Sequence, residues 1–351
     1  MDYYIELLNS LKRGVIAPVY LFYGEETYLR EQAVARFKEY FFPGRDQDLN
    51  FDLIDGEDAG PEDIVARAET LPFFAAKRLV VVKNPSFFKS AKKAGKEEIE
   101  DGEETAGPVK ETALLEYFDN PAGATCLIFT TGDPVDKRKR LFKAVQKNGR
   151  AVEFTCLNRS DLSRWLAQRA RAAGRKFAPG AAETLLDTVG PSLQKLAAEM
   201  EKLVNFTAGQ EVITPAEVRK VCPPGLEESI FAVVDAVGNK KAGEALAAIR
   251  ELLAAKEPPF RLLAMIIRQF RLLLQVKDLL GRGCPAGQIP ARLKIHPYVA
   301  RKTSVQCRNF SRESLLEAFQ LLLELDESVK TGRQEFYPAL EIFLLKLCAG
   351  S

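Results

Sequence analysis

Short apolar runs alternate with segments of helical spacing through the first 155 residues, and this alternation limits the possible folds more than any other feature. Residues 18–24 are apolar and aromatic and end in glycine, and residues 27–41 then follow with helical periodicity. The run Val80-Val81-Val82 lacks polar alternation, which is typical of a strand buried on both faces. Further strands are expected at 51–54, 78–82, 126–130 and 151–154, and further helices at 61–69 and 138–147. The pattern predicts an α/β layer built on a mostly parallel sheet.

The rest of the chain is predicted to be helical. Helices are expected at 160–173, 180–189 and 192–206, and Thr214-Pro215-Ala216-Glu217 has the spacing of a capping box with proline at the first helical position. The sequence Cys222-Pro223-Pro224-Gly225 is a strong breaker, and leucine-rich helical patterns continue beyond it. A chain of 351 residues exceeds the size of one hydrophobic core. We therefore expect three domains: an α/β domain at 1–155, a small helical domain at 156–224 and an all-helical domain at 225–351.

Composition and hydropathy indicate a soluble globular protein. Hydrophobic residues make up 46% of the chain and charged residues 28%, which is the ordinary range. The first residues lack a signal-peptide pattern, and no apolar run reaches membrane-spanning length. We expect a cytoplasmic protein that makes no membrane contact.

The charge distribution favours only local contact with nucleic acid, because the net charge is +2. Seven basic residues surround the predicted helix at 138–147 and are candidates for facing DNA phosphates: Lys137, Arg138, Lys139, Arg140, Lys143, Lys147 and Arg150. A solvated helix face is the plainer interpretation, since Asp133 and Asp136 lie beside them. Lys330 and Arg333 are weaker candidates. Charge is also dense at 89–110, where almost no large apolar residue occurs, so a loop or mobile insertion is expected there.

The sequence lacks the motifs of nucleotide and metal chemistry. A P-loop would join the first strand to its helix, but the turn Tyr23-Gly24-Glu25-Glu26-Thr27 has one glycine and two carboxylates, which would repel phosphate. The third strand ends Val82-Lys83-Asn84, without an acid that would hold magnesium. The single histidine, His296, is expected to be structural at a helix start, and the six cysteines lack metal-binding spacing. No catalytic residue, metal site or cofactor is predicted.

Four segments resemble the delta subunits of bacterial DNA polymerase III. The first is Pro18-Val19-Tyr20-Leu21-Phe22-Tyr23-Gly24-Glu25-Glu26-Thr27-Tyr28-Leu29, and the second is Leu71-Pro72-Phe73-Phe74-Ala75-Ala76-Lys77-Arg78-Leu79-Val80-Val81-Val82. The other two are Glu324-Leu325-Asp326-Glu327-Ser328-Val329-Lys330-Thr331-Gly332 and Leu340-Glu341-Ile342-Phe343-Leu344-Leu345-Lys346-Leu347-Cys348. Their order and spacing extend the resemblance over nearly the whole chain.

The resemblance implies an AAA+-like architecture, in which an α/β domain without a P-loop is followed by a helical lid at 156–224 and a helical collar at 225–351. It also implies that Phe73 and Phe74 insert into a pocket of the β sliding clamp, while Leu71 and Pro72 shape the turn. Binding would open the clamp for loading onto primed DNA. Other implied partners are clamp-loader subunits of the gamma/tau and delta prime types and primer-template DNA. The subunit would have no catalytic site, and DNA-directed DNA polymerase activity would belong to the holoenzyme.

Two other functions stay open from the sequence. One is a degenerate AAA+ protein that hydrolyses nucleotide through an unusual site, and the other is a generic helical adaptor. Nucleotide binding by the isolated chain would distinguish the first from a clamp-binding subunit. Apolar residues before a strand are commonly buried, so the alternative to clamp contact is that Phe73 and Phe74 lie in the α/β core.

Overall fold

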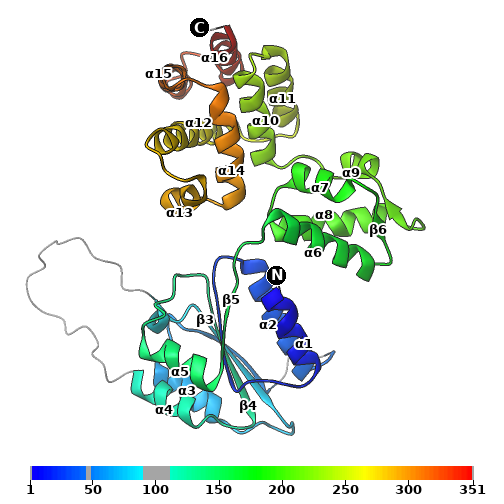
Figure 1. Cartoon of the computed structure of the whole chain (residues 1–351), viewed down its shortest axis with the longest axis vertical. Coiled ribbons are helices and arrows are strands. Elements are labelled where there is room, and N and C mark those ends of the chain that lie inside the picture. Colours follow the sequence, from blue (N-terminus) through cyan, green and yellow to red (C-terminus); the bar gives the residue numbers. More distant parts are fainter. Residues whose placement is uncertain (1, 45–48, 90–110, 350–351) are drawn as a thin grey trace, which may run out of the picture. The chain divides into compact units, whose positions relative to one another are not determined.

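The structure is a computed structural model that describes residues 2–44, 49–89 and 111–349 (Figure 1). The chain divides into two compact units, Met1–Leu157 and Asn158–Ser351, and each is described by itself. The first division falls close to the boundary expected after residue 155. The boundary expected after residue 224 lies within the second unit and stays a prediction.

The first unit contains a parallel sheet of five strands in the order β2-β3-β4-β1-β5. The strands are β1 (Val19–Tyr23), β2 (Phe51–Asp55), β3 (Arg78–Lys83), β4 (Thr125–Thr131) and β5 (Arg150–Glu153). Every neighbouring pair is parallel, which confirms the predicted sheet. All five predicted strands coincide with observed ones to within a few residues.

Helices cover both faces of this sheet (Figure 1). The helices α1 (Asp2–Lys12) and α2 (Thr27–Phe41) lie on one face, and α3 (Pro61–Glu69), α4 (Thr112–Asp119) and α5 (Arg140–Asn148) lie on the other. Within β1, Leu21 packs into the core beneath α3, α4 and α5, whereas the Phe22 ring lies 5.7 Å from that of Phe37 in α2. Strands covered on both faces have no polar alternation. Helices α1 and α4 are outside the predicted elements.

The second unit begins with four helices and a short parallel strand pair. Helices α6 (Arg159–Ala172), α7 (Ala181–Val189) and α8 (Leu193–Phe206) match the predicted ones, and α9 (Pro215–Val221) follows. The predicted capping box is confirmed, because the backbone N–H of Thr214 donates to Glu217 Oε2 at 2.7 Å. The strands β6 (Lys176–Phe177) and β7 (Val212–Ile213) have only two residues each, too few to leave a periodic signal.

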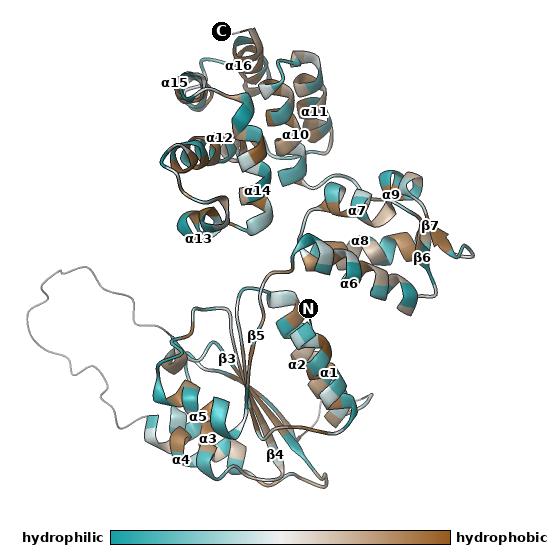
Figure 2. Ribbon diagram, viewed as in Figure 1, coloured by the Kyte–Doolittle hydropathy of each residue, from teal (hydrophilic) through white to brown (hydrophobic). Residues whose placement is uncertain are grey.

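The remaining helices share one hydrophobic core. They are α10 (Leu226–Gly238), α11 (Ala242–Ala254), α12 (Pro259–Gly281), α13 (Ile289–Leu293), α14 (Pro297–Gln306), α15 (Arg312–Lys330) and α16 (Phe336–Ala349). Two 3₁₀ turns of three residues lie among these helices, at Ala286–Gln288 and Cys307–Asn309, and another follows β3 in the first unit, at Ser86–Phe88. Apolar and polar residues mix along these helices (Figure 2), as expected of amphipathic helices in a bundle. His296 caps α14 by accepting the N–H of Tyr298 on Nδ1, which confirms its structural role.

Two further expectations concern the charged insertion at 89–110 and membrane-spanning helices. Residues 90–110 of the predicted charged insertion lie outside the described residues. Lys89 is described, and its ammonium group pairs with Asp133 at 3.1 Å and with Glu57 at 3.4 Å. Within the described residues, no helix is both long enough and apolar enough to cross a membrane.

Candidate functional site

Residues 71–77, between α3 and β3, present three large apolar side chains to solvent. The exposed fractions are 81% for Leu71, 58% for Phe73 and 96% for Phe74, while Pro72 is half-buried. The two phenyl rings lie edge to face with centroids 4.5 Å apart. We call this segment the apolar loop. The alternative in which Phe73 and Phe74 lie in the core is wrong.

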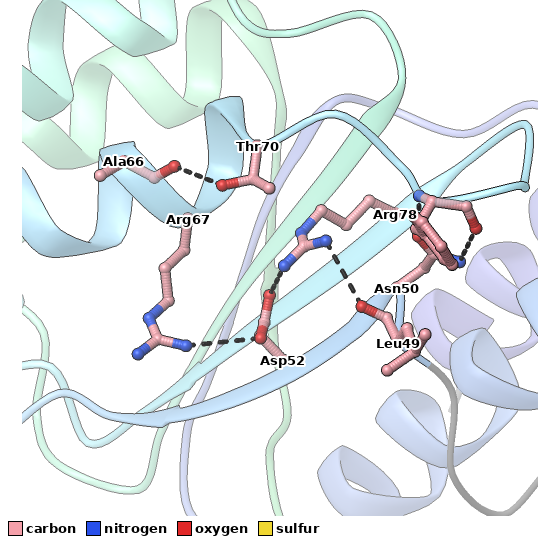
Figure 3. Close-up of polar contacts among 8 residues, drawn as sticks. Leu49, Asn50, Asp52, Ala66, Arg67, Thr70 and Arg78 are labelled. Atoms are coloured by element: carbon pink, nitrogen blue, oxygen red, sulfur yellow. Dashed lines mark hydrogen bonds and ion pairs between the residues drawn. The ribbon is translucent and has the colours of Figure 1, made fainter.

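The backbone of the apolar loop is held in an unusual conformation. Phe74 has a φ of 48°, in the left-handed region that is costly for a residue with a bulky side chain. Asn50, just before β2, bonds to the backbone of Phe73 through both polar groups of its side chain (Figure 3). Its Nδ2 donates to the Phe73 carbonyl at 3.0 Å, and the Phe73 N–H donates to its Oδ1 at 2.6 Å. Strain that is held in place at an exposed apolar segment points to a functional site.

An ion-pair network stiffens the sheet edge beside the loop (Figure 3). Arg78, at the start of β3, pairs with Asp52 of β2 and also donates to the Leu49 carbonyl at 3.5 Å. Asp52 also pairs with Arg67 of α3 at 3.5 Å. Arg78 is buried, and removing one partner of a buried ion pair is costly. The network joins β2 to α3 and β3, the two elements between which the apolar loop lies.

The turn after β1, where a P-loop would lie, is filled by the chain's own groups. Glu26 caps α2 by accepting the N–H of Tyr28 on Oε1 at 3.3 Å, so a carboxylate lies at the helix end that would otherwise attract phosphate. Burial raises the pKa of this carboxyl group. The buried Arg30 guanidinium donates to the carbonyls of Gly24 at 2.6 Å and Thr131 at 2.7 Å. Carboxylate and carbonyl oxygens thus stand where phosphate would need donors.

The nine candidate DNA-facing residues fall into two groups. Six are paired with a nearby carboxylate: Lys137 with Glu153 at 2.8 Å, Arg138 with Asp136 at 3.0 Å, Lys139 with Glu111 at 3.9 Å, Arg150 with Glu6 at 2.6 Å, Lys330 with Asp326 at 2.7 Å and Arg333 with Glu327 at 3.0 Å. The other three are exposed on α5: Arg140, Lys143 and Lys147. The hydrogen bonds between Arg138 and Asp136 lower the pKa of the Asp136 carboxyl group to about 2, so this pair is charged at neutral pH. Phosphate contact by the exposed α5 residues stays a prediction.

Sequence reasoning did not identify Asn50, Asp52 or Arg78 as part of the site. A weak signal was present for two of them, because Asp52 and Arg78 are charges within predicted strands, and charges in such places are usually paired. Asn50 gave no signal, since its partner is the backbone of a residue 23 positions away.

Comparison with known proteins decides the family. Residues 20–155 match the family model described as DNA polymerase III, delta subunit, and residues 227–347 match the model of the C-terminal domain of that subunit. The DNA polymerase III subunit delta of Bacillus subtilis (strain 168) is 34% identical over 343 residues, which cover 97% of this chain and 96% of the relative. The chain belongs to the DNA polymerase III delta subunit family.

Two further matches agree with this assignment. A solved structure titled Bacillus subtilis DNA clamp loader delta protein matches with a TM-score of 0.81 and 33% identity, over 99% of this chain and 100% of that one. The probable DNA polymerase III subunit delta of Aquifex aeolicus (strain VF5) is 23% identical over 93% of this chain and 90% of the relative. The chain is thus a delta subunit of the DNA polymerase III clamp loader, a replication protein, and the expected fold of a parallel α/β domain followed by helices is confirmed.

Proposed function

We propose that this delta subunit binds the β sliding clamp through the apolar loop and holds one interface of the ring open for loading onto primed DNA. The proposal is carried by the exposure of Phe74, which is 96%, together with its left-handed backbone. A pocket on the clamp would remove the side chains of Phe73 and Phe74 from water, and burying one phenylalanine is worth about 1.5–3 kcal/mol. Paired aromatic anchors are typical of interface hot spots.

The proposed action is mechanical. A protein that binds the open ring more tightly than the closed ring shifts the ring toward the open state. The loop is well suited to this, because Asn50 connects it to the sheet edge and limits its freedom to move. Leu71 would add apolar contact at the rim of the pocket, and the half-buried Pro72 would fix the direction of the turn.

Other surfaces would contact the other partners. Residues 225–351 would form a collar with subunits of the gamma/tau and delta prime types, using exposed apolar side chains of α15 and α16: Leu316, Leu323, Ile342 and Leu345. Primer-template DNA would lie along the exposed basic residues of α5: Arg140, Lys143 and Lys147. The assembly would act at the replisome in the bacterial cytoplasm.

We assign no catalytic step to this chain. The turn after β1 offers Glu26 and backbone carbonyls in place of phosphate-binding donors, which argues against the degenerate nucleotide hydrolase. ATP hydrolysis would belong to other loader subunits, and DNA-directed DNA polymerase activity to the holoenzyme. A generic helical adaptor would leave the strained apolar loop without a role.

Binding of the purified chain to the β clamp of the same species tests the proposal. The double variant Phe73→Ala, Phe74→Ala is compared with wild type and with Phe260→Ala, a matched control because Phe260 has the same 58% exposure as Phe73 but lies in the second unit. We expect tight binding by wild type and Phe260→Ala and at least a hundredfold loss in the double variant, from two buried rings. Equal binding by all three would rule out the apolar loop as the contact.

A further inference from the structure

We propose that Asn50 is the positioning residue of the apolar loop: its buried side-chain amide holds the Phe73 peptide so that Phe74 projects in its binding conformation. The proposal rests on the clamp-binding function proposed above. It concerns how the free protein presents the loop, because nothing in the geometry requires Asn50 itself to touch a partner. Asn50 is 3% exposed, whereas Phe74 is 96% exposed.

The Asn50 side chain bonds to both backbone polar groups of Phe73, as the backbone of a neighbouring β-strand would. Its Nδ2 donates to the Phe73 carbonyl and its Oδ1 accepts the Phe73 N–H, so one side chain satisfies both polar groups of one residue (Figure 3). The primary amide combines a donor and an acceptor at this reach. An ionised aspartate keeps the acceptor alone, and alanine keeps neither.

The backbone of Asn50 is itself well anchored. Its carbonyl accepts the N–H of Leu79 at 2.9 Å, which extends the pairing of β2 with β3 by one residue. The preceding carbonyl, that of Leu49, accepts from Arg78, which also pairs with Asp52. The side chain of Asn50 therefore projects from a stiff edge, and the loop is held relative to the sheet.

The anchor matters because the residue after it is strained. Phe74 has a φ of 48° and an almost fully exposed ring, so neither its backbone preference nor burial of its own side chain favours the observed conformation. Without Asn50, the polar groups of Phe73 can bond to water, and the loop is free to leave this conformation. Apparent affinity falls in proportion to the fraction of molecules in the competent conformation. Loss of two hydrogen bonds is expected to weaken clamp binding about tenfold.

The first test compares Asn50→Ala with wild type. The matched control is Asn158→Ala, because the Asn158 side chain also donates and accepts, toward Asp161 in the second unit. We expect Asn50→Ala to bind the β clamp about tenfold more weakly and Asn158→Ala to bind as wild type. Hydrogen exchange in the free chain should show faster exchange at 71–77 in Asn50→Ala, with the strands of the sheet still protected.

The second test uses Asn50→Asp to separate positioning from general destabilisation. An ionised carboxylate cannot donate to the Phe73 carbonyl, whereas the protonated acid can donate to it and still accept the Phe73 N–H. Clamp binding by Asn50→Asp should therefore recover toward wild type as the pH falls. The charged side chains of Asp52, Arg67 and Arg78 lie near this site, and wild type and Asn50→Ala also carry them. Comparison with those two proteins isolates the pH dependence that the new carboxyl group introduces.

The outcomes are distinct. Unchanged clamp binding and unchanged exchange at 71–77 in Asn50→Ala would overturn the positioning role while leaving clamp binding intact. Failure of wild type to bind the clamp would overturn the proposed function, and the positioning role for binding would fall with it. A loss of binding in Asn50→Ala without recovery of Asn50→Asp at lower pH would assign the loss to destabilisation and would also overturn the proposal.

Discussion

Replacement of Phe74 separates the effect on stability from the effect on binding. The side chain is 96% exposed, so Phe74→Ala removes almost no packing from the folded state. Surface substitutions of this kind usually change stability by no more than about 0.5 kcal/mol. Truncation of a buried core phenylalanine would instead cost about 3–5 kcal/mol. Thermal unfolding of Phe74→Ala should therefore match wild type.

The same change should weaken clamp binding strongly. Full burial of a phenylalanine is worth about 1.5–3 kcal/mol, which corresponds to about a 10- to 150-fold loss of affinity in calorimetric titration against the clamp. Phe74→Gly should lose as much affinity but gain about 1 kcal/mol of stability, because glycine adopts the φ of 48° without the steric cost. A destabilised Phe74→Ala that binds normally would refute the reasoning, since it would make Phe74 a packing residue rather than an anchor.

Three further predictions concern other parts of the chain. Arg30→Met should destabilise the first unit by about 3 kcal/mol or more in denaturant unfolding, because one buried and one partly buried backbone carbonyl lose a charged donor. Unchanged stability would contradict the role of Arg30 in filling the turn after β1. Burial raises the pKa of the Glu228 carboxyl group, so its ionisation opposes folding as the pH rises through that pKa. Glu228→Gln should therefore raise the melting temperature at pH 7 and lose this advantage at acidic pH, and a larger gain in acid would contradict the sign. Lys143→Ala should weaken primer-template binding by the assembled loader and reduce the salt dependence of that binding. Arg138→Ala should weaken binding less, because Arg138 is paired with Asp136. Equal losses of binding in the two variants would contradict the proposed DNA contact by α5.

The sheet was predictable because its strands are buried on both faces. In β1, β3 and β4 every position but Lys83 is buried, so the strands appear in the sequence as uninterrupted apolar runs. Helix α4 escaped prediction because its eight residues give little more than two turns of periodicity, and two-residue strands such as β6 give none.

The site could be predicted only in part. Apolar residues before a strand are usually buried, so residue types alone could not place Phe73 and Phe74 in solvent, and the family resemblance carried that expectation. The positive φ of Phe74 has no sequence signal, since glycine or asparagine is the usual residue in such a conformation. Asn50 could not be found because a side chain bonded to a distant backbone leaves no complementary residue in the sequence.

The most direct test of the account is a measurement of clamp opening by the isolated chain. A β clamp with a fluorophore pair across one subunit interface reports separation of that interface, and the chain is added without nucleotide or other loader subunits. We predict loss of energy transfer with wild type in proportion to the clamp bound, and no change with the Phe73→Ala, Phe74→Ala double variant. Binding of wild type at saturation with energy transfer unchanged would contradict the claim that this subunit opens the ring.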